Sequence, residues 1–125
     1  MSSHSFDYPL KAIQMAPQVL VGKVGLSGSA ITSNGIKGVT SIITGSSGAG
    51  SLIFNLDDTY NRLLFADFTY QTPLGTAVVN CQLSSSDVTV AKTVHVRLLS
   101  SGSSLVTPAS GSALFAMFVM ANTGQ

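Results

Sequence analysis

The sequence predicts an all-β protein, an antiparallel β-sandwich or jelly roll of about seven to eight strands preceded by an extended N-terminal arm. Apolar residues recur at every second position in several short runs, which is the side-chain period of a β-strand. Clusters of Gly, Ser, Asn and Pro separate these runs and favour turns, and no stretch has the apolar spacing of a long helix. The chain has 125 residues, so we assign 1–17 to the arm and 18–125 to a single domain.

The first half of the domain contains three predicted strands. Gln18 to Ser27 is the first, and Gly35 to Thr44, rich in β-branched residues, is the second. The glycine-rich run Gly45 to Gly50 can only be a turn or loop. Ser51 to Leu56 alternates apolar and polar residues with Ile53 as the one exception, so we expect a strand with one face in water.

A corner and two further strands follow in the middle of the chain. Asp57 to Leu63 begins with residues that favour helix N-caps and turns, which predicts one helical turn or a wide corner. Leu64 to Thr72 alternates again and ends at the turn Pro73 to Gly75. Thr76 to Leu83 is the next predicted strand.

The last two predicted strands are Val88 to Leu99 and Ala113 to Asn122. The final one is apolar on both faces, and two interpretations remain open. Its outer face is covered by the N-terminal segment or a loop, or that face contacts another subunit. The candidate interface residues on this strand share one parity: Phe115, Met117 and Val119.

The N-terminal arm contains apolar residues that follow no clean helix or strand period. Such a segment is either a mobile tail or an arm that becomes ordered on a partner. Its candidate contact residues are Phe6, Tyr8, Leu10 and Ile13. We expect it to add binding area on a partner rather than to contribute to the core of its own domain.

Charge and the length of the apolar runs argue against nucleic-acid and membrane partners, and the low charge favours self-association. The net charge is +1, and the six basic residues are scattered singly, so we expect no nucleic-acid binding. The longest apolar run, Ala113 to Ala121, is about half the ~20 residues of a membrane helix, and no signal peptide is evident. We therefore expect a soluble protein made in a cytoplasm. Charged residues are only 9% of the chain, which leaves little repulsion between copies and favours self-association.

No residue pattern indicates catalysis, a metal or a cofactor. The adjacent carboxylates Asp57 and Asp58 suit a turn better than the two opposed carboxylates of a glycosidase. Cys81 and His95 lack the sequence signature of a cysteine nucleophile and its base. Cys81 is in phase with apolar Leu83, so we interpret it as a small buried residue. We expect no enzyme activity.

A longer pattern resembles small structural proteins of tailed bacteriophages. It consists of a β-branched strand, a glycine-rich turn, an alternating strand that ends in Leu-Asp-Asp, an aromatic residue and a short Leu-rich corner, and it continues in later strand and loop segments. The segments that carry it are 39–43, 48–64, 87–88, 91–94 and 108–111. The resemblance covers about residues 19 to 123 and leaves the arm unmatched. The final strand departs from the pattern because it is more apolar.

The resemblance implies a virion protein, with a head decoration or cement protein on the capsid exterior as the favoured role. Its implied partners are further copies of itself, a homotrimer being favoured, and the major capsid protein. The arm would then lie on a sister subunit or on the capsid surface. The alternative is a tail- or fibre-associated module that binds host-surface carbohydrate. The chain has no Trp, and its three Tyr are spread over different predicted elements, so an aromatic sugar platform has little support.

Overall fold

The structure is a computed structural model that describes residues 17–46, 48, 50–72 and 80–121. All the regular elements in these ranges are strands, eight in number. In chain order they are β1 (Gln18–Ser27), β2 (Ala30–Asn34), β3 (Val39–Thr44), β4 (Ser51–Leu56), β5 (Arg62–Gln71), β6 (Asn80–Asp87), β7 (Thr93–Leu99) and β8 (Ser112–Ala121).

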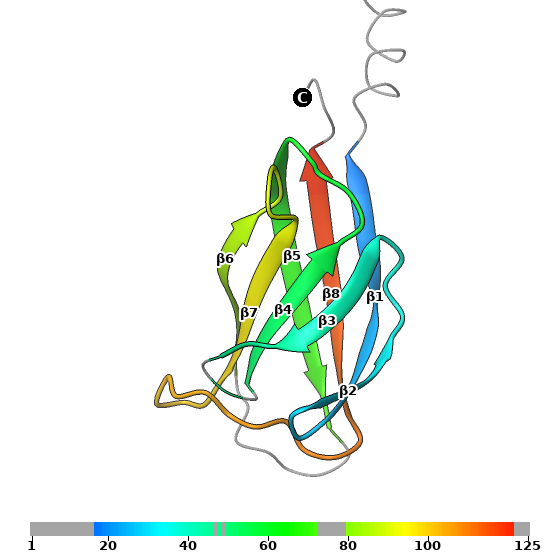
Figure 1. Ribbon diagram of the computed structural model, residues 1–125. Coiled ribbons are helices and arrows are strands. Elements are labelled where there is room, and N and C mark those ends of the chain that lie inside the picture. Colours follow the sequence, from blue (N-terminus) through cyan, green and yellow to red (C-terminus); the bar gives the residue numbers. More distant parts are fainter. Residues whose placement is uncertain (1–16, 47, 49, 73–79, 122–125) are drawn as a thin grey trace, which may run out of the picture.

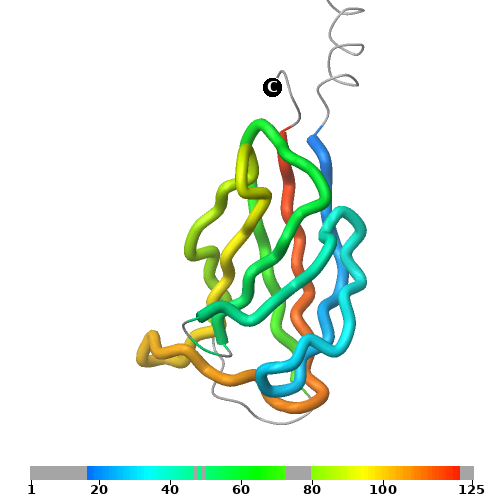
Figure 2. Tube along the Cα trace, viewed as in Figure 1, coloured from blue at the N-terminus to red at the C-terminus, as the bar shows by residue number. Residues whose placement is uncertain are grey.

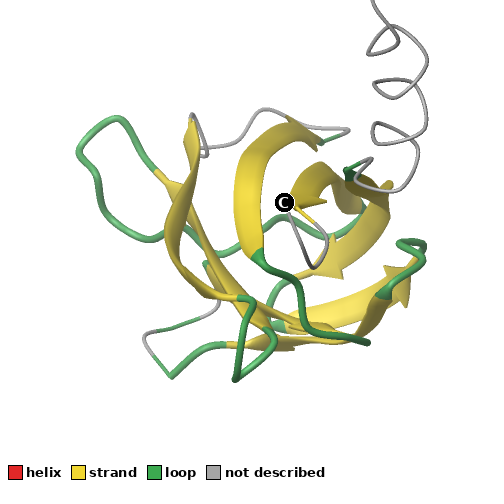
Figure 3. Cartoon of the chain, turned by 90° about the horizontal axis from the view of Figure 1, so that it is seen from above, coloured by secondary structure: helices red, strands yellow, loops and turns green. Residues whose placement is uncertain are grey.

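The strands form two four-stranded sheets that face one another (Figure 1). The first has the order β2-β1-β8-β5 and the second β3-β4-β7-β6, and the paired strands are antiparallel. The chain passes between the sheets after β2 and after β4, as the Cα trace shows (Figure 2). The strand order places two further crossings, after β5 and after β7. The predicted all-β antiparallel sandwich is thereby confirmed. Figure 3 looks down its long axis.

The core lies between the sheets and is apolar. Phe118 of β8 packs edge-on against Phe54 of β4 in the opposite sheet, with ring centroids 5.2 Å apart. It packs in the same way against Phe68 of the neighbouring β5, at 5.7 Å. Edge-to-face pairs of this kind add to the stabilisation from burial alone. The other large side chains that are fully buried are Leu26, Leu52, Leu98, Leu114, Met120, Val24, Val94 and Val96.

The segment of the chain from the end of β1 to β3 differs from the predicted structure. β1 and β4 have the predicted bounds, but only the second half of the predicted strand Gly35 to Thr44 is a strand, and β2 was not expected. Gly28, with a φ of 61°, makes a tight turn that lets β2 pair with β1 as a hairpin. The first residues of the predicted strand thus form a corner, and an unexpected hairpin precedes it.

The side chain of Asn34 builds that corner. Its Oδ1 accepts the backbone N–H of Ile36 at 3.1 Å, and its Nδ2 donates to the carbonyl of Val39 at 2.9 Å. The amide therefore satisfies backbone groups where the chain leaves one sheet for the other. Asparagine is favoured in turns because its side chain can make these local hydrogen bonds. The period of apolar residues in the sequence does not reveal such bonds.

The Asp57-Asp58 segment is a corner rather than a helical turn. Asp57 accepts a hydrogen bond from Oγ1 of Thr40, and Oδ1 of Asp58 accepts the backbone N–H of Thr59 at 2.8 Å. The two carboxylates thus serve the turn, as expected. Burial, and then the charges of Asp58 and Asp57, raise the pKa of the neighbouring Tyr60.

Two strand boundaries in the second half also move. β7 begins at Thr93 rather than Val88, because 88–91 form a turn in which Oδ1 of Asp87 accepts the backbone N–H of Val90 at 3.2 Å. β6 runs on to Asp87, beyond the predicted end at Leu83. The predicted turn 73–75 and the first residues of the predicted strand 76–83 lie outside the described residues.

Candidate functional site

The final strand has one buried face and one outward face. Leu114, Ala116, Phe118 and Met120 of β8 are buried in the core. The residues of the other parity, predicted as interface candidates, point away from the core: Phe115 is exposed, and Met117 and Val119 are partly exposed. β8 is a central strand, with β1 on one side and β5 on the other, so its outward residues lie in the middle of the sheet.

Neighbouring strands extend this apolar surface. In the cross-strand register Val119 lies between Val19 of β1 and Phe65 of β5, and Met117 lies next to Val21. The exposed large members of the set are 40% to 58% exposed. We call this surface the outer apolar face; it consists of Val19, Val21, Phe65, Phe115, Met117 and Val119. Sequence analysis had identified only its β8 residues.

Two charged side chains border the outer apolar face. The Nζ of Lys23 is 5.7 Å from the centroid of the Phe115 ring, a cation–π arrangement. Asp67 lies across from Met117 in the register, and its carboxylate accepts its neighbour's backbone N–H at 3.0 Å. Between these groups lies a shallow hollow of about 400 Å³ with Thr69 in its wall. The face is therefore apolar with a polar margin, which is the usual anatomy of a protein interface.

The outward face of the second sheet has a different character. Its residues on β4 and β7 include Ser51, Asn55, Thr93, His95 and Arg97. Two apolar residues, Ile43 and Ile53, lie side by side there. A sandwich needs only one buried face per sheet, so this mixed, polar surface is typical of a solvated sheet. The two outward faces are thus not equivalent, and the apolar one needs an explanation.

One interpretation of the sequence was that a loop or the N-terminal arm covers the outward face of the final strand. No loop in the described part of the chain does so, because the residues of this face are exposed. The other cover, the N-terminal arm, lies outside the described residues. So do its candidate contact residues Phe6, Tyr8, Leu10 and Ile13.

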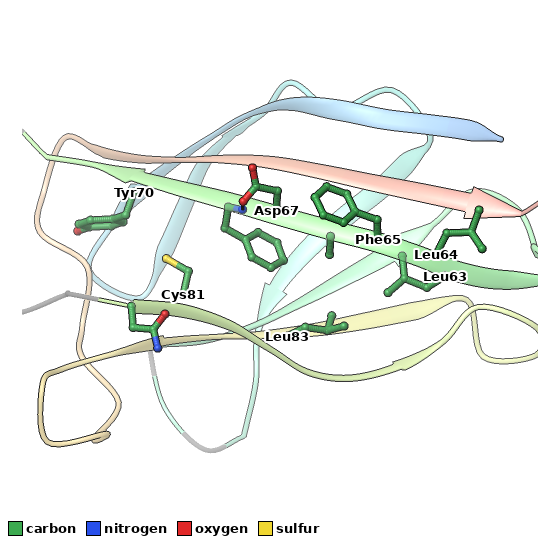
Figure 4. A pocket seen from close by; sticks show the side chains of 10 residues that line it. Leu63, Leu64, Phe65, Asp67, Tyr70, Cys81 and Leu83 are labelled. Carbon is green, nitrogen blue, oxygen red and sulfur yellow. Dashed lines mark hydrogen bonds between the residues drawn. The ribbon is translucent and has the colours of Figure 1, made fainter.

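A second surface feature lies where the two sheets end on the same side of the sandwich. β5 is the edge of the first sheet and β6 the edge of the second, and a groove of about 660 Å³ runs between them (Figure 4). We call it the edge groove. Its lining is Leu63, Leu64, Phe65, Ala66, Asp67, Phe68, Tyr70, Asn80, Cys81 and Leu83. Sequence periodicity could not reveal it, because the groove depends on which strands end each sheet.

Two irregularities shape the walls of the edge groove. The β5 register shifts between Leu63 and Phe65, so Leu64 is an extra, bulged residue and is 44% exposed. The β6 register shifts between Leu83 and Ser85, and Leu83 is 40% exposed. The β5 bulge breaks the alternation that the sequence predicted from Leu64 onward, whereas the β6 irregularity lies just beyond the predicted strand end at Leu83.

Cys81 lies in the wall of the edge groove. It is half-buried and packs against the core cluster, so the prediction of a buried small residue is correct only in part. The reason is that β6 is an edge strand with a neighbour on one side. Burial raises the pKa of the Cys81 thiol to about 11. Cys81 pairs with Leu98 in the β6–β7 register, whereas His95 pairs with Ser85, so the two are not brought together.

Within the ranges that the structure describes, no three His, Cys, Asp or Glu residues are grouped so as to hold a metal ion. No helix in those same ranges is long and apolar enough to cross a membrane. Comparisons with protein-family models, curated proteins and solved structures gave no match.

Proposed function

We propose that the chain is a structural subunit of a phage virion, a head decoration protein that assembles with its own copies and with the capsid through the outer apolar face. The observation that carries this proposal is the exposed apolar surface in the middle of the β2-β1-β8-β5 sheet. Contiguous apolar surface on a folded protein usually marks an interface. The strand and turn pattern that resembles phage structural proteins supplies the context.

The size of the face indicates the kind of assembly. The face spans three strands at ~4.8 Å spacing and about three outward positions along each strand, two residues apart. Its footprint is therefore roughly 300 Å². A standard protein interface buries about 800 Å² per partner, so this face forms the centre of an interface and not a whole one. Affinity then comes from several modest contacts repeated by symmetry, as in a homotrimer or on a shell.

A decoration role fits such contacts. Each copy adds a modest interaction between capsid subunits, and the sum over a symmetric shell resists internal pressure. The polar outward face of the second sheet is suited to remain in solvent while the apolar one is buried.

The test compares virions that carry the protein with virions that lack it. Particles without it should assemble but release their genome at a lower temperature or under milder osmotic stress, and the protein added back should restore them. If such particles are as robust as the normal ones but no longer adsorb to cells, the proposal is wrong and the protein belongs to the adhesion class.

A further inference from the structure

β5 is an open edge strand. It pairs with β8 on one side and has no neighbour on the other side among the described strands. It is ten residues long, against five in β2 at the opposite edge of the same sheet, and it contains neither Lys nor Pro. Native proteins usually shorten, charge or cover a sheet edge, because an open edge can pair with another strand. The β5 edge therefore favours a partner strand.

The pairing of β1 shows which backbone groups face this edge. The carbonyl oxygen of Lys23 accepts the backbone N–H of Gly35 at 2.9 Å, where β1 and β2 pair. A strand residue directs its N–H and C=O to the same side, and successive residues alternate. Lys23 therefore faces β2, and Val24 faces β8, where it pairs with Leu114.

The same alternation continues across β8 to β5. Because Leu114 faces β1, Phe115 directs its backbone groups to β5, where it pairs with Thr69. Thr69 therefore faces β8, and residues of the other parity face the free edge. These are Ala66, Phe68 and Tyr70, whose side chains pack against the core and line the edge groove (Figure 4). The open edge thus lies directly beside partly covered core residues.

A hydrogen bond of Asp67 agrees with this assignment. Its Oδ1 accepts the backbone N–H of Phe68 at 3.0 Å, in an exposed position. The carboxylate thus satisfies a donor that faces away from β8. A carbonyl group of a partner strand could accept the same N–H, which would release the carboxylate for another donor.

The side chains of β5 fit a second copy of the same strand. Directly opposite residues of an antiparallel pair share a face, so inward residues must lie opposite inward residues. A two-fold axis at Phe68 places this ring opposite its own copy. It also places Ala66 opposite Tyr70, a small residue opposite a large one. On the outward face Asp67 then lies opposite Thr69, whose hydroxyl can donate to the carboxylate.

Other positions of the axis are less favourable. An axis at Asp67 would place two carboxylates directly opposite each other, which destabilises a strand pair. An axis at Thr69 would pair only 67–71, and an axis nearer the start of the strand would bring the bulge into the pair. The axis at Phe68 pairs 65–71, the stretch of β5 in which the register is unbroken.

We propose that β5 pairs with β5 of a second copy in this register, so that the first sheets of the two copies become one sheet. The inward side chains of each β5 then cover the edge groove of the other copy. The outer apolar faces of the two copies become neighbours, because Phe65 belongs both to the outer apolar face and to the edge groove. The inference rests on the proposed self-assembly and adds a second contact to it.

The strand pair is too small to hold two copies together alone. Seven residues at ~3.4 Å each, with a sheet thickness of ~10 Å, cover roughly 240 Å² per copy. A standard interface covers about 800 Å² per partner. The β5 pair therefore forms where the outer apolar face has already brought copies together. A two-fold contact does not occur within a closed trimer, so this one links a copy in one trimer to a copy in the next.

The first experiment tests the register with disulfides in full-length protein that also carries Cys81→Ser. Chains with Asp67→Cys and chains with Thr69→Cys, coexpressed and mildly oxidised, should form a mixed disulfide, because the two positions lie opposite each other. Each variant alone should link at least about tenfold more slowly, since its own copies are a diagonal step of ~7–8 Å apart. Fast self-linking of Asp67→Cys would place the axis at Asp67 and overturn the proposal.

The solution mass before oxidation separates this proposal from that of the outer apolar face. Assembled protein that forms no mixed disulfide would overturn the β5 pairing and leave the outer apolar face in place. Protein that is monomeric before oxidation and still forms the mixed disulfide would support the β5 pairing and count against the outer apolar face.

The second experiment changes the charge at one exposed position of β5 and needs no cysteine. Thr69→Lys places a cation opposite Asp67 and should lower the concentration at which species larger than a trimer form, by at least about threefold at low salt. Thr69→Asp places a second carboxylate there and should raise that concentration by a similar factor. Sedimentation velocity provides the measurement. Equal weakening by both substitutions would show that Thr69 contacts an apolar surface, and would overturn the β5 pairing.

Discussion

Gly22 shows how one missing side chain permits the crossing between sheets. It lies on the inward face of β1, and a Cβ added there would meet the backbone of the corner, with the Gly35 carbonyl oxygen nearest and its carbon at 2.8 Å. Backbone atoms cannot move aside as a flexible side chain can. We therefore expect Gly22→Ala to destabilise the fold by about 1–3 kcal/mol in urea unfolding.

Gly102→Ala is the control for Gly22. A Cβ at Gly102 would meet only the Ser100 hydroxyl oxygen, at 3.8 Å, which is ordinary contact. Its effect should stay within about 0.5 kcal/mol. If both glycines tolerate alanine equally, the close crossing at Gly35 is wrong.

Cys81 gives a second prediction at the residue scale, in its pH dependence. Burial raises its pKa to about 11 from an ordinary 9.0. The thiolate is the reactive form, so at pH 8 its fraction should be about a hundredfold lower than in the unfolded chain. Raising the pH from 8 should increase the alkylation rate until about pH 11. A rate that levels off near pH 9 would contradict the burial of this thiol.

At the scale of the element, β8 separates folding from assembly by parity. Phe118→Asp would bury a charge beside Phe54 and Phe68 and should unfold the domain, a loss above about 4 kcal/mol. Phe115→Asp places the same charge on the outward face, 40% exposed, and should cost less than about 1 kcal/mol. Circular dichroism melting curves of the two variants provide the measurement. Unfolding by both would show that the outward side of β8 is part of the core.

The same strands show how far sequence reasoning reaches. β1 and β4 were predicted to the residue and β8 to within one residue at each end, because residues that favour turns, such as Gly28, Gly50 and Gly111, border these strands. β2 was missed, and β6 and β7 were displaced, because their ends are set by local side-chain bonds such as those of Asn34 and Asp87. Such bonds leave no mark on hydrophobic periodicity.

The candidate sites were predictable to different degrees. The outward residues of β8 stood out because a strand that is apolar on both faces is unusual in a two-layer fold. Val19, Val21 and Phe65 joined them only when the register placed them beside Val119 and Met117. The edge groove was beyond prediction, since strand order in the sheets is a long-range property of the chain.

At the scale of the whole molecule, the outer apolar face and the edge groove meet at Phe65, which lines both. The first sheet is thus apolar on its outward side and open along its β5 edge.

Because the face is apolar, its association should depend on salt differently from an ion-paired interface. Sulfate should strengthen self-association by favouring burial, while sodium chloride below 0.5 M, as a rough guide, should change it little. Dissociation by moderate sodium chloride, measured by sedimentation velocity, would indicate an interface made by charges instead.

The most direct test of the central claim, that the outer apolar face is an assembly surface, is the solution mass of the full-length protein and of Phe115→Asp. Light scattering coupled to size exclusion at micromolar concentration should give a trimer or larger assembly for the wild type and a folded monomer for the variant. Ile43→Asp, a change on the outward face of the other sheet, should keep the wild-type mass. A wild-type protein that is a stable monomer under these conditions would contradict the account.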